Sequence, residues 1–234
     1  MCLIFKNIGN RFPIIMASVL SSASVFAGVM GGVDGTYSPP YDGFYVGADV
    51  GLSNLLDKES HVNFSETQRL GGLGIIGGGF IGYDYSITDR VKLGLEGFGT
   101  ANGLNTSTQH FNTDTSYNVS SQYSAGFRVL PGYELIPGAI GHIILGYSNT
   151  QFRIKDNGNY GFINYSTNKN GFQSGLGFLI SLTQSVLIRF DGSYTTFASE
   201  SKRGTSKVTP MAYQYYTNDF STFAGDLSLV YKFN

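Results

Sequence analysis

Several short motifs in this 234-residue chain contain the residue types that catalysis or cofactor binding requires. Residues 72–77 read Gly-Leu-Gly-Ile-Ile-Gly, the spacing of a dinucleotide-binding loop, and Glu96 follows where a ribose-binding acid would stand. That motif binds pyrophosphate only where it follows a strand and begins a helix. Here a polar segment precedes the glycines and a glycine-rich strand pattern follows. We therefore interpret them as positions of strand bending and close packing.

The histidines and the cysteine do not form a reactive group. His61, His110 and His142 are scattered without the short spacing of metal ligands, so we expect ordinary hydrogen bonding at the surface or in the interior. Cys2 lies in an N-terminal segment that we expect to be removed, which leaves no disulfide or thiolate site. No strand pattern places a serine and a histidine together on the outward face, as a nucleophile and its base would require there. The sequence predicts a non-enzymatic protein with no cofactor and no metal.

The N-terminus has the pattern of an export signal. Lys6 and Arg11 precede an apolar run that ends in Val-Phe-Ala at 25–27. We predict a signal peptide at 1–27, a flexible glycine- and proline-containing leader at 28–42, and one β-barrel domain at 43–234. Loss of the two cations changes the formal charge from −1 to −3. This charge is too weak and too mixed to indicate nucleic-acid binding.

The end of the chain has a regular alternation. Leu227, Leu229, Tyr231 and Phe233 alternate with other residues, and a strand with this period has one apolar and one polar face. Similar segments recur along the chain. The 32 glycines, 16 tyrosines and 18 phenylalanines, against 13% charged residues, suit twisted strands with aromatic girdles. The pattern is typical of a transmembrane β-barrel whose apolar residues face lipid.

The alternation predicts an all-β fold, an eight-stranded antiparallel up-and-down transmembrane β-barrel. The strands are expected at 43–54, 71–87, 90–103, 117–135, 139–154, 171–182, 185–198 and 219–233. Tight turns at 88–89, 136–138 and 183–184 alternate with long polar loops at 55–70, 104–116, 155–170 and 199–218. Outer-membrane barrels have short turns in the periplasm and long loops outside the cell. Both termini are therefore expected in the periplasm.

The same alternation assigns eight charged residues to the barrel interior, four cations and four anions: Asp49, Lys92, Glu96, Arg128, Arg189, Asp191, Asp226 and Lys232. An eight-stranded barrel is just wide enough for its own side chains, so buried charges there must be paired. We predict that Glu96 pairs with Arg128, and that Asp191 or Asp226 pairs with Arg189 or Lys232. The balance of sign favours a structural salt-bridged plug. An ion pathway, which an excess of one sign would favour, remains the alternative.

Four segments with glycine and aromatic residues carry a family resemblance: 41–48 (Tyr-Asp-Gly-Phe-Tyr-Val-Gly-Ala), 82–85 (Gly-Tyr-Asp-Tyr), 145–147 (Leu-Gly-Tyr) and 229–233 (Leu-Val-Tyr-Lys-Phe). Over about 43–233 the chain resembles the opacity-protein-like outer-membrane β-barrel family, related in architecture to the transmembrane domain of outer-membrane protein A. The resemblance implies a role in surface structure or adhesion, with loops that contact host surface molecules. A narrow pore for ions or small solutes is the runner-up, and a lipid-modifying enzyme is third.

The barrel interpretation also predicts the location and partners of the protein. We expect a monomer in the outer membrane of a Gram-negative bacterium, in contact with outer-membrane lipid and lipopolysaccharide, with its loops at the cell surface. The resemblance further implies that Leu229, Tyr231 and Phe233 form a C-terminal assembly signal read by the barrel assembly machinery.

Overall fold

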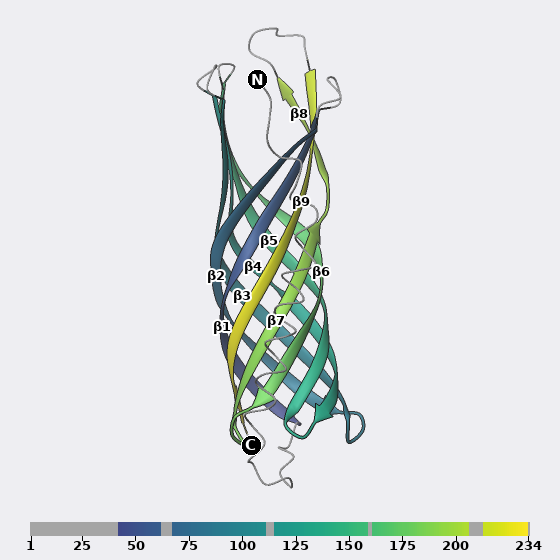
Figure 1. Cartoon of the computed structure of the whole chain (residues 1–234). Coiled ribbons are helices and arrows are strands. Elements are labelled where there is room, and N and C mark those ends of the chain that lie inside the picture. The colour runs from purple at the N-terminus through teal and green to yellow at the C-terminus, as the bar shows by residue number, and fades with distance from the viewer. Residues whose placement is uncertain (1–41, 62–66, 111–114, 159–160, 206–212, 234) are drawn as a thin grey trace. The chain divides into compact units, whose positions relative to one another are not determined.

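The computed structural model describes residues 42–61, 67–110, 115–158, 161–205 and 213–233, which form one antiparallel sheet closed on itself (Figure 1). Its strands are β1 (Gly43–His61), β2 (Thr67–Ser86), β3 (Val91–His110), β4 (Thr115–Ile136), β5 (Ala139–Gly158), β6 (Gly161–Ser181), β7 (Val186–Phe197), β8 (Glu200–Thr205) and β9 (Tyr213–Lys232). None of these residues belongs to a helix long and apolar enough to cross a membrane. The predicted signal peptide and all of the leader except Asp42 lie outside the described residues.

The barrel closes through β9, which pairs with β1 from Tyr45↔Lys232 to His61↔Tyr216. β7 pairs with residues 221–231 of β9, whereas the short β8 pairs with residues 213–218. β8 therefore continues the position of β7 in the sheet after a break at residues 198–199. The wall of the barrel has eight strands, as the sequence predicts.

The two ends of the barrel differ in their connections. At one end, called the turn end here, short turns join β2 to β3, β4 to β5 and β6 to β7. The β4–β5 turn contains Pro137 and Gly138, and Gly138 has a φ of 85°, which glycine adopts without steric cost. β1 begins beside them, and the preceding Asp42 accepts from the backbone N–H of Ser86 through Oδ1. Hydrogen bonding by the side chain of Ser86, and then by its backbone N–H, lowers the pKa of the Asp42 carboxyl. The opposite end is called the loop end.

The strands at the loop end run well beyond their predicted limits, which corrects the four long loops expected at 55–70, 104–116, 155–170 and 199–218. β1 continues to His61 and β3 to His110, and Leu55↔Gly72 and Gln109↔Ser116 are paired. The tips at 62–66, 111–114, 159–160 and 206–212 lie outside the described residues. The prediction failed because it required apolar residues on the outward face. Backbone pairing has no such requirement where a strand faces water.

The outward face is apolar from the turn end to the middle of the barrel. Phe127, Leu145 and Leu229 are 60%, 43% and 59% exposed there. Aromatic rings mark both edges of this apolar band. Phe44 meets Tyr83 edge-on with 4.9 Å between centroids at the turn end. The exposed aromatic residues at the other edge are Tyr123, Tyr147, Phe172, Tyr194 and Phe223. These features are those of a surface surrounded by lipid with interfacial aromatic residues.

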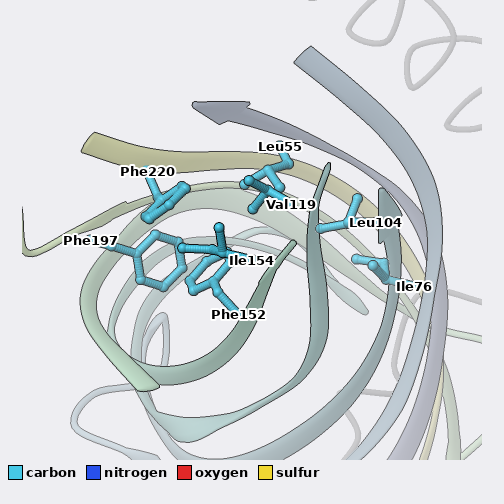
Figure 2. Packing of buried hydrophobic residues seen from close by; sticks show 8 residues of the cluster. All are labelled: Leu55, Ile76, Leu104, Val119, Phe152, Ile154, Phe197 and Phe220. Atoms are coloured by element: carbon cyan, nitrogen blue, oxygen red, sulfur yellow. The ribbon is translucent and has the colours of Figure 1, made fainter. Parts of the chain in front are cut away.

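Beyond this upper edge the two faces of the wall exchange character. Outward positions on β5 become polar, as at Asn149 and Lys155, and inward positions become apolar. On β1 and β2 the outward face stays partly apolar at this level, with Leu56, Leu73 and Ile75 exposed. Eight buried apolar side chains, called the apolar cap here, fill the interior (Figure 2): Leu55, Ile76, Leu104, Val119, Phe152, Ile154, Phe197 and Phe220. The part of the barrel near the loop end is therefore built like a water-soluble protein around its own hydrophobic core.

The apolar cap is held together by its aromatic rings. Phe152 stacks on Phe220 with centroids 4.8 Å apart and meets Phe197 edge-on at 5.1 Å. On their strands Phe152 and Phe197 lie nearer the loop end than Tyr147 and Tyr194, which mark the edge of the apolar band. Burial of each large apolar side chain contributes roughly 1.5–3 kcal/mol. The cap thus closes the interior at and beyond the upper edge of the band.

Candidate functional site in the barrel interior

The structure places the eight predicted interior charges on inward-facing positions. Six of them are buried: Lys92, Glu96, Arg128, Arg189, Asp191 and Lys232. Asp49 and Asp226 are partly buried and line an internal cavity. The strand alternation explains this placement, since each of these residues stands between outward-facing neighbours.

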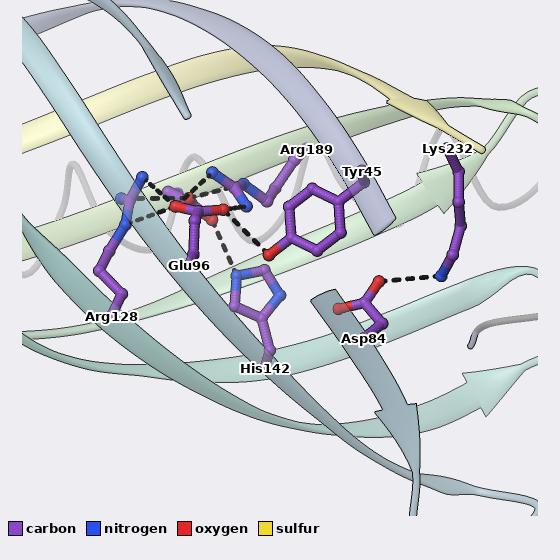
Figure 3. A network of polar contacts seen from close by, with 8 residues as sticks. Tyr45, Asp84, Glu96, Arg128, His142, Arg189 and Lys232 are labelled. Atoms are coloured by element: carbon purple, nitrogen blue, oxygen red, sulfur yellow. Dashed lines mark hydrogen bonds and ion pairs between the residues drawn. The ribbon is translucent and has the colours of Figure 1, made fainter. Parts of the chain in front are cut away.

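Glu96 on β3 is the common acceptor of the buried charges (Figure 3). Arg128 Nε on the adjacent β4 donates to Glu96 Oε1 at 2.7 Å, the pair expected from the sequence. Arg189 Nη1 on β7 donates to Glu96 Oε2 at 2.6 Å, and the hydroxyl of Tyr45 on β1 donates to the same oxygen at 3.2 Å. One carboxylate therefore links four strands across the interior.

Asp191 on β7 is the second acceptor and joins the same two arginines. Arg189 Nε lies 2.9 Å from Asp191 Oδ2, and Arg128 Nη1 lies 3.9 Å from it. His142 Nε2 lies 2.9 Å from Asp191 Oδ1. We call Glu96, Arg128, Arg189 and Asp191 the central network. It has two cations and two anions, the condition under which charges removed from water are tolerated.

Aromatic rings support the two arginines. The guanidinium carbon of Arg189 lies 4.0 Å from the centroid of Phe80, and that of Arg128 lies 4.7 Å from the centroid of Phe98. A planar guanidinium can stack on a ring while its edge donates hydrogen bonds, which an ammonium cannot do. Gly47 makes room for Phe80, because a Cβ there would lie 2.2 Å from the ring. The central network is therefore fixed by ring contacts as well as by charge.

The two lysines bind separately, near the turn end. Lys232 Nζ lies 3.0 Å from Asp84 Oδ2, and Lys92 Nζ donates to Ser86 Oγ at 2.9 Å. Of the predicted pairings of Asp191 or Asp226 with Arg189 or Lys232, the structure contains Asp191 with Arg189. Lys232 pairs with Asp84 instead. β1 lies between the strands of Asp84 and Lys232, and Tyr45 on β1 is opposite both Gly82 and Lys232. The tilt of the strands brings these residues together, and sequence spacing does not reveal that tilt.

The sequence reasoning did not place Tyr45 or Asp84 in the interior, and it left His142 to hydrogen bonding either at the surface or in the interior. The alternation itself could have identified His142, because Ile143 and Leu145 point outward and leave His142 on the inner face. It also leaves Asp84 inside, between the exposed Tyr83 and Tyr85. Their partners could not be predicted, since contacts between non-adjacent strands depend on the register around the whole barrel.

Two cavities lie on either side of the central network. A cavity of about 60 Å³, called the chamber here, has Arg128 on one side and cap residues Ile76 and Phe197 on the other. Nine of its lining residues carry hydroxyl groups: Ser53, Thr100, Ser121, Ser124, Ser148, Thr150, Ser193, Thr195 and Thr222. A cavity of about 30 Å³ lies toward the turn end beside Lys232 and Asp84. From turn end to loop end, the interior thus contains a small cavity, the central network, the chamber and the cap.

The contact between His142 and Asp191 can be compared with the geometry that a nucleophilic or metal site requires. His142 and Asp191 form the base and orienting half of a catalytic triad, but in the described part of the chain no serine or threonine hydroxyl hydrogen-bonds to His142. Within the same ranges, no three His, Cys, Asp or Glu side chains are grouped to hold a metal ion. The contact between His142 and Asp191 connects β5 with β7 across the interior.

A family model matches the chain, and several solved structures align with it. The family model described as outer membrane protein beta-barrel domain matches residues 14–233. No curated protein sequence matches the chain. Solved structures that align with it include the outer membrane protease OmpT from Escherichia coli, with 12% identity, 85% of this chain and 99% of that chain covered, and a TM-score of 0.48.

Two further solved structures align with similar coverage. Neisserial surface protein A has 14% identity, with 81% of this chain and 97% of that chain covered and a TM-score of 0.41. Ail, the attachment invasion locus protein of Yersinia pestis, has 14% identity, 82% and 99% coverage, and a TM-score of 0.37. The match of the family model includes every strand of the barrel, and on that basis the chain belongs to the family of outer membrane protein beta-barrel domains.

Proposed function

We propose that this protein is a closed, non-enzymatic barrel that anchors a surface structure in the outer membrane and contacts other molecules through its loop end. The observation that carries the proposal is that the central network and the apolar cap fill the interior one above the other. A barrel blocked in two places acts through its outer surfaces. We infer that the loop end acts in adhesion or in contact with host surface molecules.

The two blocking layers oppose conduction for different physical reasons. An ion crossing the central network would separate Glu96 from Arg128 and Arg189, which are 6% exposed or less. An ion crossing the apolar cap would lose its hydration among Phe152, Phe220 and their neighbours, and apolar constrictions exclude water. These two layers favour a closed barrel over a narrow pore for ions or small solutes. A lipid-modifying enzyme is the third alternative.

The loop end supports a role in contact. Its strands stay paired beyond the apolar band and carry polar outward residues there, such as Asn149 and Lys155. In this proposal the barrel therefore extends past the lipid. In this proposal the loop end faces the outside of the cell, and the apolar band contacts outer-membrane lipid and lipopolysaccharide. The protein is a monomer, and Leu229, Tyr231 and Phe233 form the signal for the barrel assembly machinery. All three side chains point outward from β9 or the residue that follows it.

Single-channel recording of the refolded protein tests closure. We expect no regular openings in the wild type, and openings in a variant that combines Glu96→Ala, Arg128→Ala, Phe152→Ala and Phe220→Ala, which removes side-chain volume from both layers. Gln151→Ala on the outward face of β5 is the matched control and should stay silent. Uniform, well-resolved openings of the wild-type protein would instead establish the pore.

A cell-binding assay tests the contact role. Each loop tip, at 62–66, 111–114, 159–160 or 206–212, is replaced by a short Gly-Ser linker, and an epitope tag at Pro137 reports orientation. We expect at least one replacement to abolish binding of the bacterium to host cells while the barrel still folds. The Pro137 tag should be inaccessible on intact cells. Unchanged binding in all four variants, or surface labelling at Pro137, would contradict the proposal.

A further inference from the structure

The wall of the barrel divides into two groups of strands near the loop end. The ladder between β2 and β3 ends at Ile76↔Asn102, and the ladder between β6 and β7 ends at Gly171↔Phe197. Among the described residues, β8 pairs only with β9. Beyond these points β8, β9, β1 and β2 form one group, and β3, β4, β5 and β6 form the other. Figure 1 shows β8 near the loop ends of β1 and β2, apart from those of the teal strands.

The two seams between these groups differ. At the β2–β3 seam the backbones stay in contact, because a Cβ on Gly72 would overlap the carbonyl oxygen of Asn105, and a Cβ on Gly74 would overlap that of Gly103. At the other seam, β8 keeps the place of β7 beside β9 and is not a neighbour of β6 in the sheet. Residues 161–169 of β6 therefore pair with β5 on one side only. We call this segment the open edge.

The open edge directs backbone groups to the side that lacks a strand. The N–H of Ala198 donates to the carbonyl oxygen of Asn170 at 2.9 Å, so this carbonyl points toward β7. Backbone groups alternate in direction along a strand, so the N–H and C=O of Asn164, Ser166 and Asn168 point the same way. No described residue pairs with their backbones on that side. Their side chains are exposed and uncharged, whereas sheet edges are commonly protected by charged residues or proline.

The side chains beside the open edge determine what an added strand would contact. Tyr165 is only partly buried and packs against the apolar cap. Phe197, the last residue of β7, belongs to the cap and lies where the β6–β7 ladder stops. A strand that continued this ladder along β6 would cover Tyr165 with its inward side chains. Its outward side chains would lie in water beside Asn164 and Ser166, so apolar and polar residues should alternate in it.

We propose that the open edge binds an extended segment of a partner polypeptide, which adds to β6 as a further strand with alternating apolar and polar residues. In strand addition the backbone hydrogen bonds provide affinity and the pockets for alternate side chains provide specificity. The segment would extend a ladder that the barrel already has between β6 and β7. The open edge is about 30 Å long at about 3.3 Å per residue. This inference rests on the proposed contact role of the loop end and names the class of its partner.

Peptide selection on the refolded protein tests the open edge. Random twelve-residue peptides displayed on phage are selected on the full barrel in lipid nanodiscs, and the selected sequences are synthesised for affinity measurements. Ser166→Pro removes one N–H of the open edge and is compatible with an edge strand, whereas Ser166→Ala keeps that N–H. We expect selected peptides to alternate apolar and polar residues, and to bind Ser166→Pro at least tenfold more weakly than the wild type or Ser166→Ala. Both variants should keep the wild-type urea midpoint.

Methylation of the peptide backbone provides a second measurement on the unmodified protein. Every second peptide nitrogen is methylated, in one of two alternating sets. We expect one set to lower affinity at least tenfold and the other to have little effect, because only one side of the added strand faces β6. Equal effects of the two sets, equal binding to Ser166→Pro and the wild type, or a selection without alternating peptides would overturn the inference.

The remaining outcomes distinguish this inference from the proposed function. If Ser166→Pro binds host cells like the wild type while a loop-tip replacement abolishes binding, the contact role stands and the open edge is not its surface. If the wild type forms dimers in nanodiscs that Ser166→Pro abolishes, the edge pairs with a second copy of the chain, and the inference of a partner polypeptide fails.

Discussion

At the level of single residues, Glu96 holds the interior together because its two oxygens bind two arginines from different strands. Without Glu96, Arg128 and Arg189 would share only Asp191, and one buried positive charge would lack compensation. Removal of Arg128 as well leaves Arg189 paired with Asp191 at 2.9 Å. The cost of a mutation here depends on the charge that it leaves behind.

Glu96→Leu should therefore destabilise the barrel more than the double change Glu96→Leu with Arg128→Leu. Breaking one side of a buried ion pair typically costs about 3–5 kcal/mol, whereas replacing both partners by apolar residues can be nearly neutral. The urea midpoint, read from the altered gel mobility of the unheated folded barrel, measures the difference. Equal midpoints for the two variants would mean that Arg128 finds another partner.

At the level of elements, each strand has two parts with opposite inside and outside character. β5 presents Leu145 outward in the apolar band and buries Phe152 nearer the loop end. In the band, burial against lipid stabilises outward residues, while beyond it the hydrophobic effect in water stabilises inward ones. The same strand therefore depends on two different solvents for its stability.

Phe152→Ala should open the loop end and leave the membrane part folded. Phe152 is fully buried among cap residues, and truncation of a core phenylalanine costs about 3–5 kcal/mol. We expect a protease to cleave the variant at the loop end faster than it cleaves the wild type. Before digestion, the unheated variant should still migrate on a gel as a folded barrel. Phe172→Ala, which truncates a ring on the outward face of β6, is the control and should not increase proteolysis.

At the level of the whole molecule, the sequence predicts the barrel because period-two alternation is strong wherever the outward face meets lipid. It predicts the Glu96–Arg128 pair because these residues lie opposite each other on adjacent strands. It misses Lys232 with Asp84, and Arg189 with Glu96, because those contacts cross the interior and depend on strand tilt. It misses the strand extensions because polar outward residues resemble loops when only apolar faces are counted.

The position of the apolar band predicts a sharp difference between two arginine substitutions on one strand face. Ile143→Arg and Gln151→Arg both point outward from β5, eight residues apart. Ile143 lies midway between the start of β5 and Tyr147 at the edge of the band, whereas Gln151 lies beyond that edge. A cation near the bilayer midplane costs about 2–4 kcal/mol, and near the interface about 0–1. Refolding into vesicles should therefore be impaired by Ile143→Arg alone. Equal yields of the two variants would place the band elsewhere.

The exchange of faces also fixes how deeply the barrel sits in the bilayer. If the barrel sank, the outward Asn149 and Asn170 would enter hydrocarbon, and if it rose, Leu145 and Phe172 would enter water. Each strand residue rises about 3.3 Å. A vertical shift of the barrel by even one or two residues therefore costs free energy in either direction. Mismatched membranes would then have to thin or thicken around the protein. The positions of polar and apolar outward residues along the strands therefore determine how far the loop end projects above the lipid.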